Sequence, residues 1–331
     1  MLNGKTVMIT GGTDSFGKQC YRDILTRFDP QKVIVFSRDE LKQSEMAADP
    51  VFSTEKIRFF LGDVRDEPQL KRAMVRVNYV IHRAALKQVP AAEYNPHEFI
   101  NTNINGAMNV VDAAISMGVQ RVIALSTDKA VNPINLYGAT KLCSDKIFIA
   151  GNSYSGRINT RFSVVRYGNV IGSRGSVIPI FLKQKEKGLI TITKKEMTRF
   201  VITIQEGVSF ALQSLKDMIG GEIFIPKLPS CTIGDLAEAI APGCPIRTIG
   251  LRPGEKLHES LIPADEAHHT TEQEDRFIIH PSNPYWQYDS EQYKGKVCPE
   301  GFGYDSYTNP EKLSVSDLCS LVEKFKNSDS D

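Results

Sequence analysis

TVMITGGTDSFG, residues 6–17, is the stretch that decides the fold. Its first five residues form an apolar, partly β-branched run of the kind found in strands buried on both faces. The turn from Thr10 to Gly17 then leads into a helix-length segment. Backbone N–H groups at such a helix start can hold a pyrophosphate. A plain glycine-rich turn has the same pattern, so this motif needs support from the rest of the chain.

The glycine spacing fits a G-x-x-G-x-x-G dinucleotide fingerprint at its first and third positions, while Asp14 replaces the middle glycine. A carboxylate at this point is expected to crowd or repel the pyrophosphate unless it turns outward. If it does hinder the phosphates, Asp14→Gly tightens cofactor binding. The turn residues expected to surround the cofactor are Gly11, Thr13, Asp14, Ser15, Phe16 and Gly17.

Short apolar runs alternate with amphipathic segments over the first half of the chain. The expected strands are Thr6–Thr10, Lys32–Ser37, Ile57–Leu61, Tyr79–His82, Val122–Ser126 and Phe162–Tyr167. The expected helices between them include Gly17–Phe28, Pro68–Val75, Asn103–Met117 and Leu136–Asn152. Such alternation predicts an α/β fold with a doubly wound parallel sheet of the Rossmann type.

The sequence composition changes after Gly168, where segments rich in Gly, Ser, Arg and Pro indicate loops. One later stretch still fits the first domain, with a helix at Ile204–Lys216 and a strand at Gly221–Pro226. We therefore predict a cofactor-binding domain of residues 1–168 plus about 204–226. Residues 169–203 plus 227–331 are expected to form a smaller, substrate-binding lobe over the carboxyl edge of the sheet.

Composition excludes several classes of partner. Over 331 residues, 40 Lys and Arg against 39 Asp and Glu leave a formal charge of +1, which offers no footprint for nucleic acid or an anionic membrane. We see no signal peptide and no apolar run long enough for a transmembrane helix. The six cysteines are scattered, which favours free thiols in a reducing cytoplasm over disulfides or a zinc site.

The end of the second expected strand is where an adenosine ribose would lie. Ser37 and Arg38 stand there, and Lys42 follows one helical turn later, a set that suits the 2′-phosphate of NADP. Alternatively, the two cations are solvated charges that pair with Asp39 and Glu40. Asp63 follows the third strand and is placed to accept a hydrogen bond from adenine.

Tyr137 and Lys141 supply the chemical signal. They lie four residues apart on an expected helix and therefore share a face. An ammonium beside a tyrosine, together with a cationic nicotinamide ring, favours the phenolate. Tyr137 is then a base that can take a hydroxyl proton while hydride leaves for the cofactor.

Together these residues resemble the extended short-chain dehydrogenase/reductase superfamily over nearly the whole chain. Within it the chain is most similar to the UDP-N-acetylglucosamine 4,6-dehydratases that invert C-5. The resemblance is carried by SRDELKQSE (37–45), GDVRD (62–66), AALK (84–87), STDK (126–129), NPINLYGATK (132–141), VRYGNV (165–170), GSRGSV (172–177), MTRF (197–200) and RPGEKLHE (252–259). Asp14 and Arg83 depart from the family pattern, in which a glycine and a small residue are expected.

The resemblance implies a three-step reaction. Tyr137, tuned by Lys141, takes the proton of the C-4 hydroxyl while NADP+ takes hydride, and Thr127 holds the 4-oxygen. Lys129, which must be neutral, then removes the C-5 proton as Asp128 protonates the departing C-6 hydroxyl. Hydride returns to C-6 and C-5 is reprotonated from the opposite face. A turn salt bridge without chemistry remains the alternative for Asp128 and Lys129.

The resemblance also implies the other contacts. Val64, Arg83, Lys87 and Asn103 are expected near the cofactor together with the residues already named. The expected substrate contacts are Lys87, Asn169, Arg174, Val177, Thr193, Arg199, Arg252, Glu255, Ser306 and Asn309. The family assembles as homo-oligomers and feeds surface sugars such as pseudaminic acid.

Other functions fit part of the pattern. A UDP-sugar 4-epimerase shares Tyr137, Lys141 and the cofactor but needs no acid–base pair for C-5 and C-6. A non-catalytic NADP-binding scaffold is favoured only by Asp14. The acidic and histidine-rich stretch at 265–275 fixes no tetrahedral ligand set, so we expect no metal. His82 ends an apolar strand and is expected to be a packed core residue.

Overall fold

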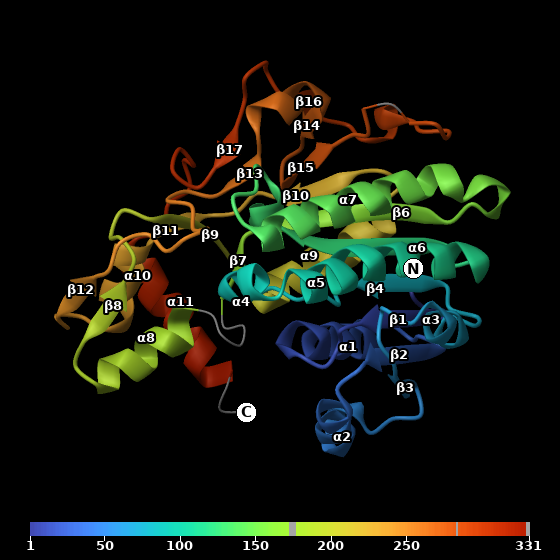
Figure 1. Cartoon of the computed structure of the whole chain (residues 1–331), viewed down its shortest axis with the longest axis horizontal. Coiled ribbons are helices and arrows are strands. Elements are labelled where there is room, and N and C mark those ends of the chain that lie inside the picture. The colour runs from blue at the N-terminus through green and yellow to red at the C-terminus, as the bar shows by residue number, and fades with distance from the viewer. Residues whose placement is uncertain (172–176, 283, 329–331) are drawn as a thin grey trace.

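The computed structural model describes residues 1–171, 177–282 and 284–328. Its main sheet has ten strands, which run from orange at the top to blue at the bottom of Figure 1. Their order is β16 (Lys296–Val297), β14 (Thr270–Glu272), β15 (Arg276–Ile279), β10 (Ile223–Pro226), β6 (Arg161–Tyr167), β5 (Arg121–Thr127), β4 (Tyr79–His82), β1 (Thr6–Thr10), β2 (Lys32–Ser37) and β3 (Ile57–Leu61). The strands from β10 to β3 are parallel, as the sequence predicts.

The central strands are buried along their length. All five residues of β1 and all four of β4 are buried, because helices cover both faces of the sheet. The expected strands of the first half are confirmed, and β5 and β6 each begin one residue earlier than expected. The helical turn that we expected at Lys42 is the start of α2 (Glu40–Ala48).

Two groups of helices form the layers. α1 (Ser15–Arg27) packs against α9 (Ile204–Asp217), while α3 (Glu67–Ala73), α6 (Gly106–Ser116) and α7 (Leu136–Tyr154) pack in succession. α6 and α7 are the long green helices near the middle of Figure 1. The shorter helices are α4 (Val89–Tyr94), α5 (Pro96–Phe99), a π-helical turn at Ile100–Asn105, and 3₁₀ turns at Pro50–Phe52, Asp128–Ala130, Gly156–Ile158, Ala264–His269 and Ser290–Gln292.

A smaller lobe lies at one end of the sheet (Figure 1). It contains α8 (Val177–Glu186), β8 (Ile190–Ile192), α10 (Ile233–Ile240), β12 (Ile246–Thr248) and α11 (Val315–Ser328). These elements share a separate apolar core, which includes Phe181, Leu236 and Leu318. A three-stranded sheet of β7 (Asn169–Val170), β9 (Thr198–Ile202) and β11 (Ser230–Thr232) accompanies it, and β13 (Ser260–Ile262) pairs with β17 (Tyr304–Asp305).

The expected domain boundary needs one correction. We placed all of 227–331 in the smaller lobe, but β14, β15 and β16 extend the main sheet. β15 pairs antiparallel with β10, and Phe277, Ile278 and Ile279 join the main core. Burying these apolar residues against β10 covers an edge of the parallel sheet that would otherwise be unpaired. Within the described residues, no helix is both long and apolar enough to cross a membrane.

Candidate active site

Strand register gathers the candidate residues at one edge of the sheet. Thr10 on β1 is level with His82 on β4, and Thr127 on β5 is level with Tyr167 on β6. Because these strands are parallel, the residues that follow each strand meet at their carboxyl ends, where doubly wound sheets bind ligands. His82 is itself buried, and its Nδ1 lies 2.9 Å from the hydroxyl of Thr10, so the expectation of a packed core histidine is confirmed.

The first of three pockets lies beyond β1, β2 and β3. Its lining includes Gly11, Thr13, Asp14, Ser37, Arg38, Lys42, Asp63, Val64 and Arg83 from the predicted cofactor set. The cations here already have partners, because Lys42 Nζ lies 2.5 Å from Asp39 and an Arg38 nitrogen lies 3.5 Å from Asp63. Both cationic side chains remain at least two-fifths exposed, so they are free to turn toward an incoming phosphate.

Asp63 has a neighbouring arginine as its partner. Its carboxylate receives hydrogen bonds from Arg65 Nη2 at 2.7 Å and from Arg65 Nε at 3.0 Å. Burial alone raises the pKa of Asp63, but the bonds from Arg65 outweigh that effect and lower the pKa. Asp63 still lines the first pocket, so the adenine contact that we expect would share this carboxylate with Arg65.

The two departures from the family pattern contact each other. Asp14 caps the start of α1 by accepting the N–H of Gly17, and its other carboxylate oxygen forms an ion pair with Arg83. The side chain thus bridges the start of α1 and the end of β4. We expected this carboxylate to crowd or repel the pyrophosphate unless it turns outward, and in the structure its charge is paired with Arg83.

The second pocket holds the predicted chemistry. It is lined by Thr127, Lys129, Tyr137 and Lys141, with Ser15, Phe16, Lys87 and Asn169 among the other predicted residues. The start of α7 lies against the turn at Asp128–Ala130, and a Cβ at Gly138 would overlap the carbonyl oxygen of Lys129. Only glycine permits this approach, which brings Tyr137 and Lys129 to the same pocket.

Tyr137 and Lys141 are both buried, and the side chains alone do not favour the phenolate, which we expected from the ammonium together with a cationic nicotinamide ring. Burial raises the pKa of Tyr137 to about 12, although the charge of Lys129 opposes the rise. Lys141 donates to the carbonyl oxygen of Leu125 at 3.0 Å, and burial lowers its own pKa. The side chains alone therefore keep Tyr137 protonated at neutral pH.

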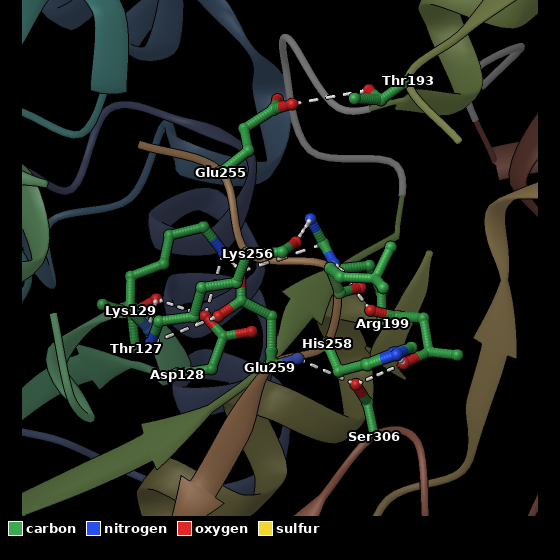
Figure 2. A network of polar contacts seen from close by, with 12 residues as sticks. Thr127, Asp128, Lys129, Thr193, Arg199, Glu255, Lys256, His258, Glu259 and Ser306 are labelled. Carbon is green, nitrogen blue, oxygen red and sulfur yellow. Dashed lines mark hydrogen bonds and ion pairs between the residues drawn. The ribbon is translucent and has the colours of Figure 1, made fainter. Parts of the chain in front are cut away.

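Asp128 and Lys129 form a cluster with a third group, Glu259 (Figure 2). Lys129 Nζ lies 3.0 Å from Asp128 Oδ1 and 3.6 Å from Glu259 Oε1. Burial by itself lowers the pKa of Lys129, but the two carboxylates outweigh it and raise the pKa. The neutral lysine expected from the sequence is therefore the minor form in this structure.

Asp128 also differs in its exposure. It is completely buried and does not line the pocket, whereas its neighbours Thr127 and Lys129 do. Thr127 donates its hydroxyl to Asp128 Oδ1 at 2.8 Å, and Asp128 Oδ2 has no hydrogen-bond partner among the described residues. Any proton exchange between Asp128 and a pocket ligand must therefore pass through Thr127 or Lys129.

The third pocket lies between β9 and the smaller lobe. Of the predicted substrate contacts, its lining includes Asn169, Val177, Thr193, Arg199, Arg252 and Glu255. Glu255 faces Thr193 at 3.4 Å and lies 3.7 Å from Arg252, whose side chain is 59% exposed. Asn169 and Val170 line both this pocket and the second one, so the two pockets are adjacent.

Several predicted contacts have structural partners instead. Ser306 is fully buried and bonded to Thr198 and to the N–H of Glu259, and Asn309 holds the carbonyl of Leu228. Asn103 is buried and bonded to Leu86 and Thr140. These polar side chains satisfy backbone groups, which accounts for their burial without a ligand.

Arg199 and Arg174 are the two predicted arginine contacts besides Arg252. Arg199 lines the third pocket but donates to the carbonyls of Thr198, Leu257 and Lys256, so it fixes the segment that ends in Glu259. Arg174 lies outside the described residues.

Glu259 is the site residue that the sequence analysis missed. It is 2% exposed, burial raises its pKa, and it lies within 4 Å of Lys129, Arg199 and Lys256. Its stretch, RPGEKLHE, was noted only as one of those that carry the family resemblance. A carboxylate that ends a conspicuous motif was the available signal, but its contact with Lys129 depends on tertiary structure.

The Rossmann sheet, the glycine-rich turn and the Tyr137–Lys141 pair define an extended short-chain dehydrogenase/reductase. The chain belongs to the family described as "Polysaccharide biosynthesis protein", whose model matches residues 7–281. It is 50% identical, over 97% of its length and 98% of the relative, to a Campylobacter jejuni "UDP-N-acetylglucosamine 4,6-dehydratase (inverting)".

Two further comparisons mark the range of the family. A "UDP-glucose 4-epimerase" of Rickettsia canadensis is 44% identical over 80% of each chain. The solved structure of Pen from Bacillus thuringiensis matches with a TM-score of 0.90 at 36% identity, over 98% of this chain and 99% of that one. Relatives with different named activities therefore share the fold, and the site must distinguish between those activities.

Proposed function

We propose that this protein is a UDP-N-acetylglucosamine 4,6-dehydratase that inverts C-5 of the sugar. The observation that carries the proposal is the cluster of Asp128, Lys129 and Glu259 beside Tyr137. Oxidation at C-4 needs only one base, whereas loss of water across C-5 and C-6 also needs a base and an acid. The inverting dehydratase from Campylobacter jejuni, at 50% identity, supports the same assignment.

A nicotinamide dinucleotide fits the first and second pockets, and NADP is the form that we propose. Backbone N–H groups at the start of α1 face the site of the pyrophosphate, while Arg38 and Lys42 supply exposed cations for a 2′-phosphate. When bound, NADP+ accepts hydride from C-4 and later returns it to C-6, so the overall reaction is redox-neutral. Tyr137 takes the proton of the C-4 hydroxyl, and Thr127 holds the oxygen.

The elimination starts from the ion pair. One proton moved over the 3.0 Å from Lys129 Nζ to Asp128 gives a neutral lysine and a neutral carboxylic acid. Lys129, on the pocket wall, then removes the proton from C-5. Asp128 passes its proton through the Thr127 hydroxyl to the departing C-6 oxygen, which leaves as water. Lys129 is the proposed C-5 base, and Asp128 is the proposed acid.

The third pocket is proposed to hold UDP. Arg252 supplies an exposed cation, and Thr193 and Asn169 offer polar groups. Asn169 also lines the second pocket. UDP-N-acetylglucosamine can then extend from this pocket so that its sugar reaches Tyr137. A homo-oligomer in the cytoplasm that serves surface-sugar synthesis is part of the same proposal and follows from the family resemblance.

The second candidate is a UDP-sugar 4-epimerase, which the 44% identity to the Rickettsia protein favours. The two functions differ in product mass. We expect mass spectrometry after incubation with UDP-N-acetylglucosamine and NADP+ to show a product lighter by one water, and none with Tyr137→Phe. A product of unchanged mass with altered C-4 configuration would establish the epimerase instead.

A further inference from the structure

Asp14 and Arg83 lie where the first and second pockets meet. Both side chains line both pockets, together with Ala85. The first pocket contains the proposed adenosine contacts, and the second contains Tyr137. A dinucleotide that spans the two pockets must therefore place its pyrophosphate beside these two residues.

The backbone fixes the position of Arg83. Thr10 and His82 are level on neighbouring strands, so Arg83 emerges next to the glycine-rich turn. Its N–H donates to the hydroxyl of Thr10 at 3.1 Å, and its Nη1 donates to the carbonyl of Gly11 at 3.2 Å. Gly11 has a φ of +66°, and a Cβ there would lie 2.8 Å from the Cα of Ala84. The turn and the end of β4 are thus held in direct contact.

Arg83 has contacts on a second side. The guanidinium carbon lies 5.7 Å from the ring centre of Phe16, and Nη2 forms the ion pair with Asp14. The side chain is 19% exposed and that of Asp14 is 31% exposed, so both are partly open to the pockets. A guanidinium held by a carboxylate, a carbonyl and a ring has lost most of its conformational freedom before a ligand arrives.

Charge explains why the two residues must act together. Asp14 stabilises the start of α1, because a carboxylate at a helix N-terminus is favourable. The same carboxylate, unpaired, would repel the two phosphate charges of a dinucleotide. Paired with Arg83 it is neutralised, and the guanidinium keeps further N–H donors that suit phosphate oxygens.

We propose that Arg83 binds the pyrophosphate of the nicotinamide dinucleotide and that Asp14 is the positioning residue that holds the guanidinium in place. The pair adds a side-chain site for phosphate beside the glycine-rich turn. This inference rests on the cofactor part of the proposed function. It does not depend on the sugar, the elimination or the product.

Isothermal titration with NADP+ and with NAD+, in the absence of sugar, tests the pair through a double-mutant cycle. The proteins are the wild type, Arg83→Ala, Asp14→Asn and the double variant. Asn keeps a side-chain oxygen for the helix cap but removes the charge. We expect Arg83→Ala to raise the Kd at least about tenfold for both dinucleotides, because it leaves the carboxylate of Asp14 unpaired beside the phosphates.

The coupling between the two residues is the decisive result. Arg83→Ala raises the Kd by some factor in the wild type and by another in the Asp14→Asn background. We expect the second factor to be smaller than the first by at least about threefold. Equal effects in both backgrounds would overturn the pair, and so would unchanged binding by Arg83→Ala. A loss confined to NADP+ would also contradict the proposal, because both dinucleotides carry the same pyrophosphate.

Controls separate this inference from folding and from the proposed function. Arg22→Ala removes an arginine of α1, the helix that Asp14 caps. Arg22 pairs with Asp49 and lines neither pocket, so this variant should leave the Kd unchanged. Arg83→Gln replaces Arg83→Ala if the latter melts earlier without cofactor. If the wild type binds neither dinucleotide, the proposed cofactor fails and this inference with it. If the wild type binds both dinucleotides but the double-mutant cycle shows no coupling, the role of the Asp14–Arg83 pair is overturned and the proposed cofactor is not.

Discussion

Lys129 lies between two carboxylates, and this placement determines how readily it can become a base. Asp128 and Glu259 stabilise the ammonium, so the neutral lysine is scarce at neutral pH. Transfer of the proton to Asp128 yields base and acid in one step, and Glu259 then remains as the negative neighbour. In the proposed mechanism, Glu259 is thus a positioning residue: its charge affects the elimination, and its side chain does not line the second pocket.

Glu259→Gln should therefore change the pH profile. Loss of one carboxylate charge lowers the pKa of Lys129, because Glu259 is one of the two groups that raise it. We expect the rise of C-5 proton exchange with pH to move to lower pH, measured by deuterium uptake from solvent. In Lys129→Ala, exchange should fall by about 100-fold or more while C-4 oxidation persists. An unshifted profile in Glu259→Gln would contradict this role.

The protonation state of Tyr137 should make the rate of C-4 oxidation depend on pH. Because burial raises its pKa to about 12, the phenolate is the minor form and its fraction grows as pH rises. We expect single-turnover formation of reduced cofactor to increase with pH, by up to about tenfold per unit below that pKa. Tyr137→Phe should abolish the step yet bind NADP+ normally. A rate that is flat from neutral to alkaline pH would exclude Tyr137 as the base.

At the scale of elements, the start of α7 must lie close to the turn at Asp128–Ala130. Gly138→Ala adds a methyl group that overlaps the Lys129 carbonyl, so we expect destabilisation of about 1–3 kcal/mol and a large loss of turnover. Chemical denaturation and steady-state rates measure both effects.

Gly207→Ala is the matched control for this substitution. Gly207 is also helical, but its added Cβ meets its nearest neighbour at an ordinary 3.4 Å. Its stability should be unchanged or higher by up to about 1 kcal/mol, because alanine favours a helix. Equal behaviour of the two variants would argue against the close approach of α7.

The elements also show what local sequence can predict. The strands of the first half were predictable because each is a short apolar run, and β1, β2 and β4 are buried almost along their whole length, whereas β3 is a partly exposed edge strand. β14 to β16 were not, since pairing at a sheet edge depends on a partner far away in the chain. The contacts of Asp14 with Arg83 and of Glu259 with Lys129 were missed for the same reason. Motifs identified the residues, whereas only the fold revealed their partners.

At the scale of the whole molecule, three adjacent pockets lie between the proposed adenosine end and the smaller lobe. If NADP+ and UDP occupy separate ends, each should raise the Tm, and together their effects should add. At about 100 times its Kd a ligand contributes about 2.7 kcal/mol, which corresponds to a Tm shift of a few degrees. Arg252→Ala should remove the shift by UDP only. Competition between the two ligands would contradict separate pockets.

We propose that this molecule eliminates water across C-5 and C-6 and inverts C-5. The decisive measurement is NMR of the product formed from UDP-N-acetylglucosamine in deuterated water. We expect a 4-keto-6-deoxy sugar with one solvent deuterium at C-5 and the inverted, L-arabino configuration, because Lys129 removes the proton and reprotonation comes from the opposite face. A product that keeps its C-6 hydroxyl, or one without deuterium at C-5, would contradict it.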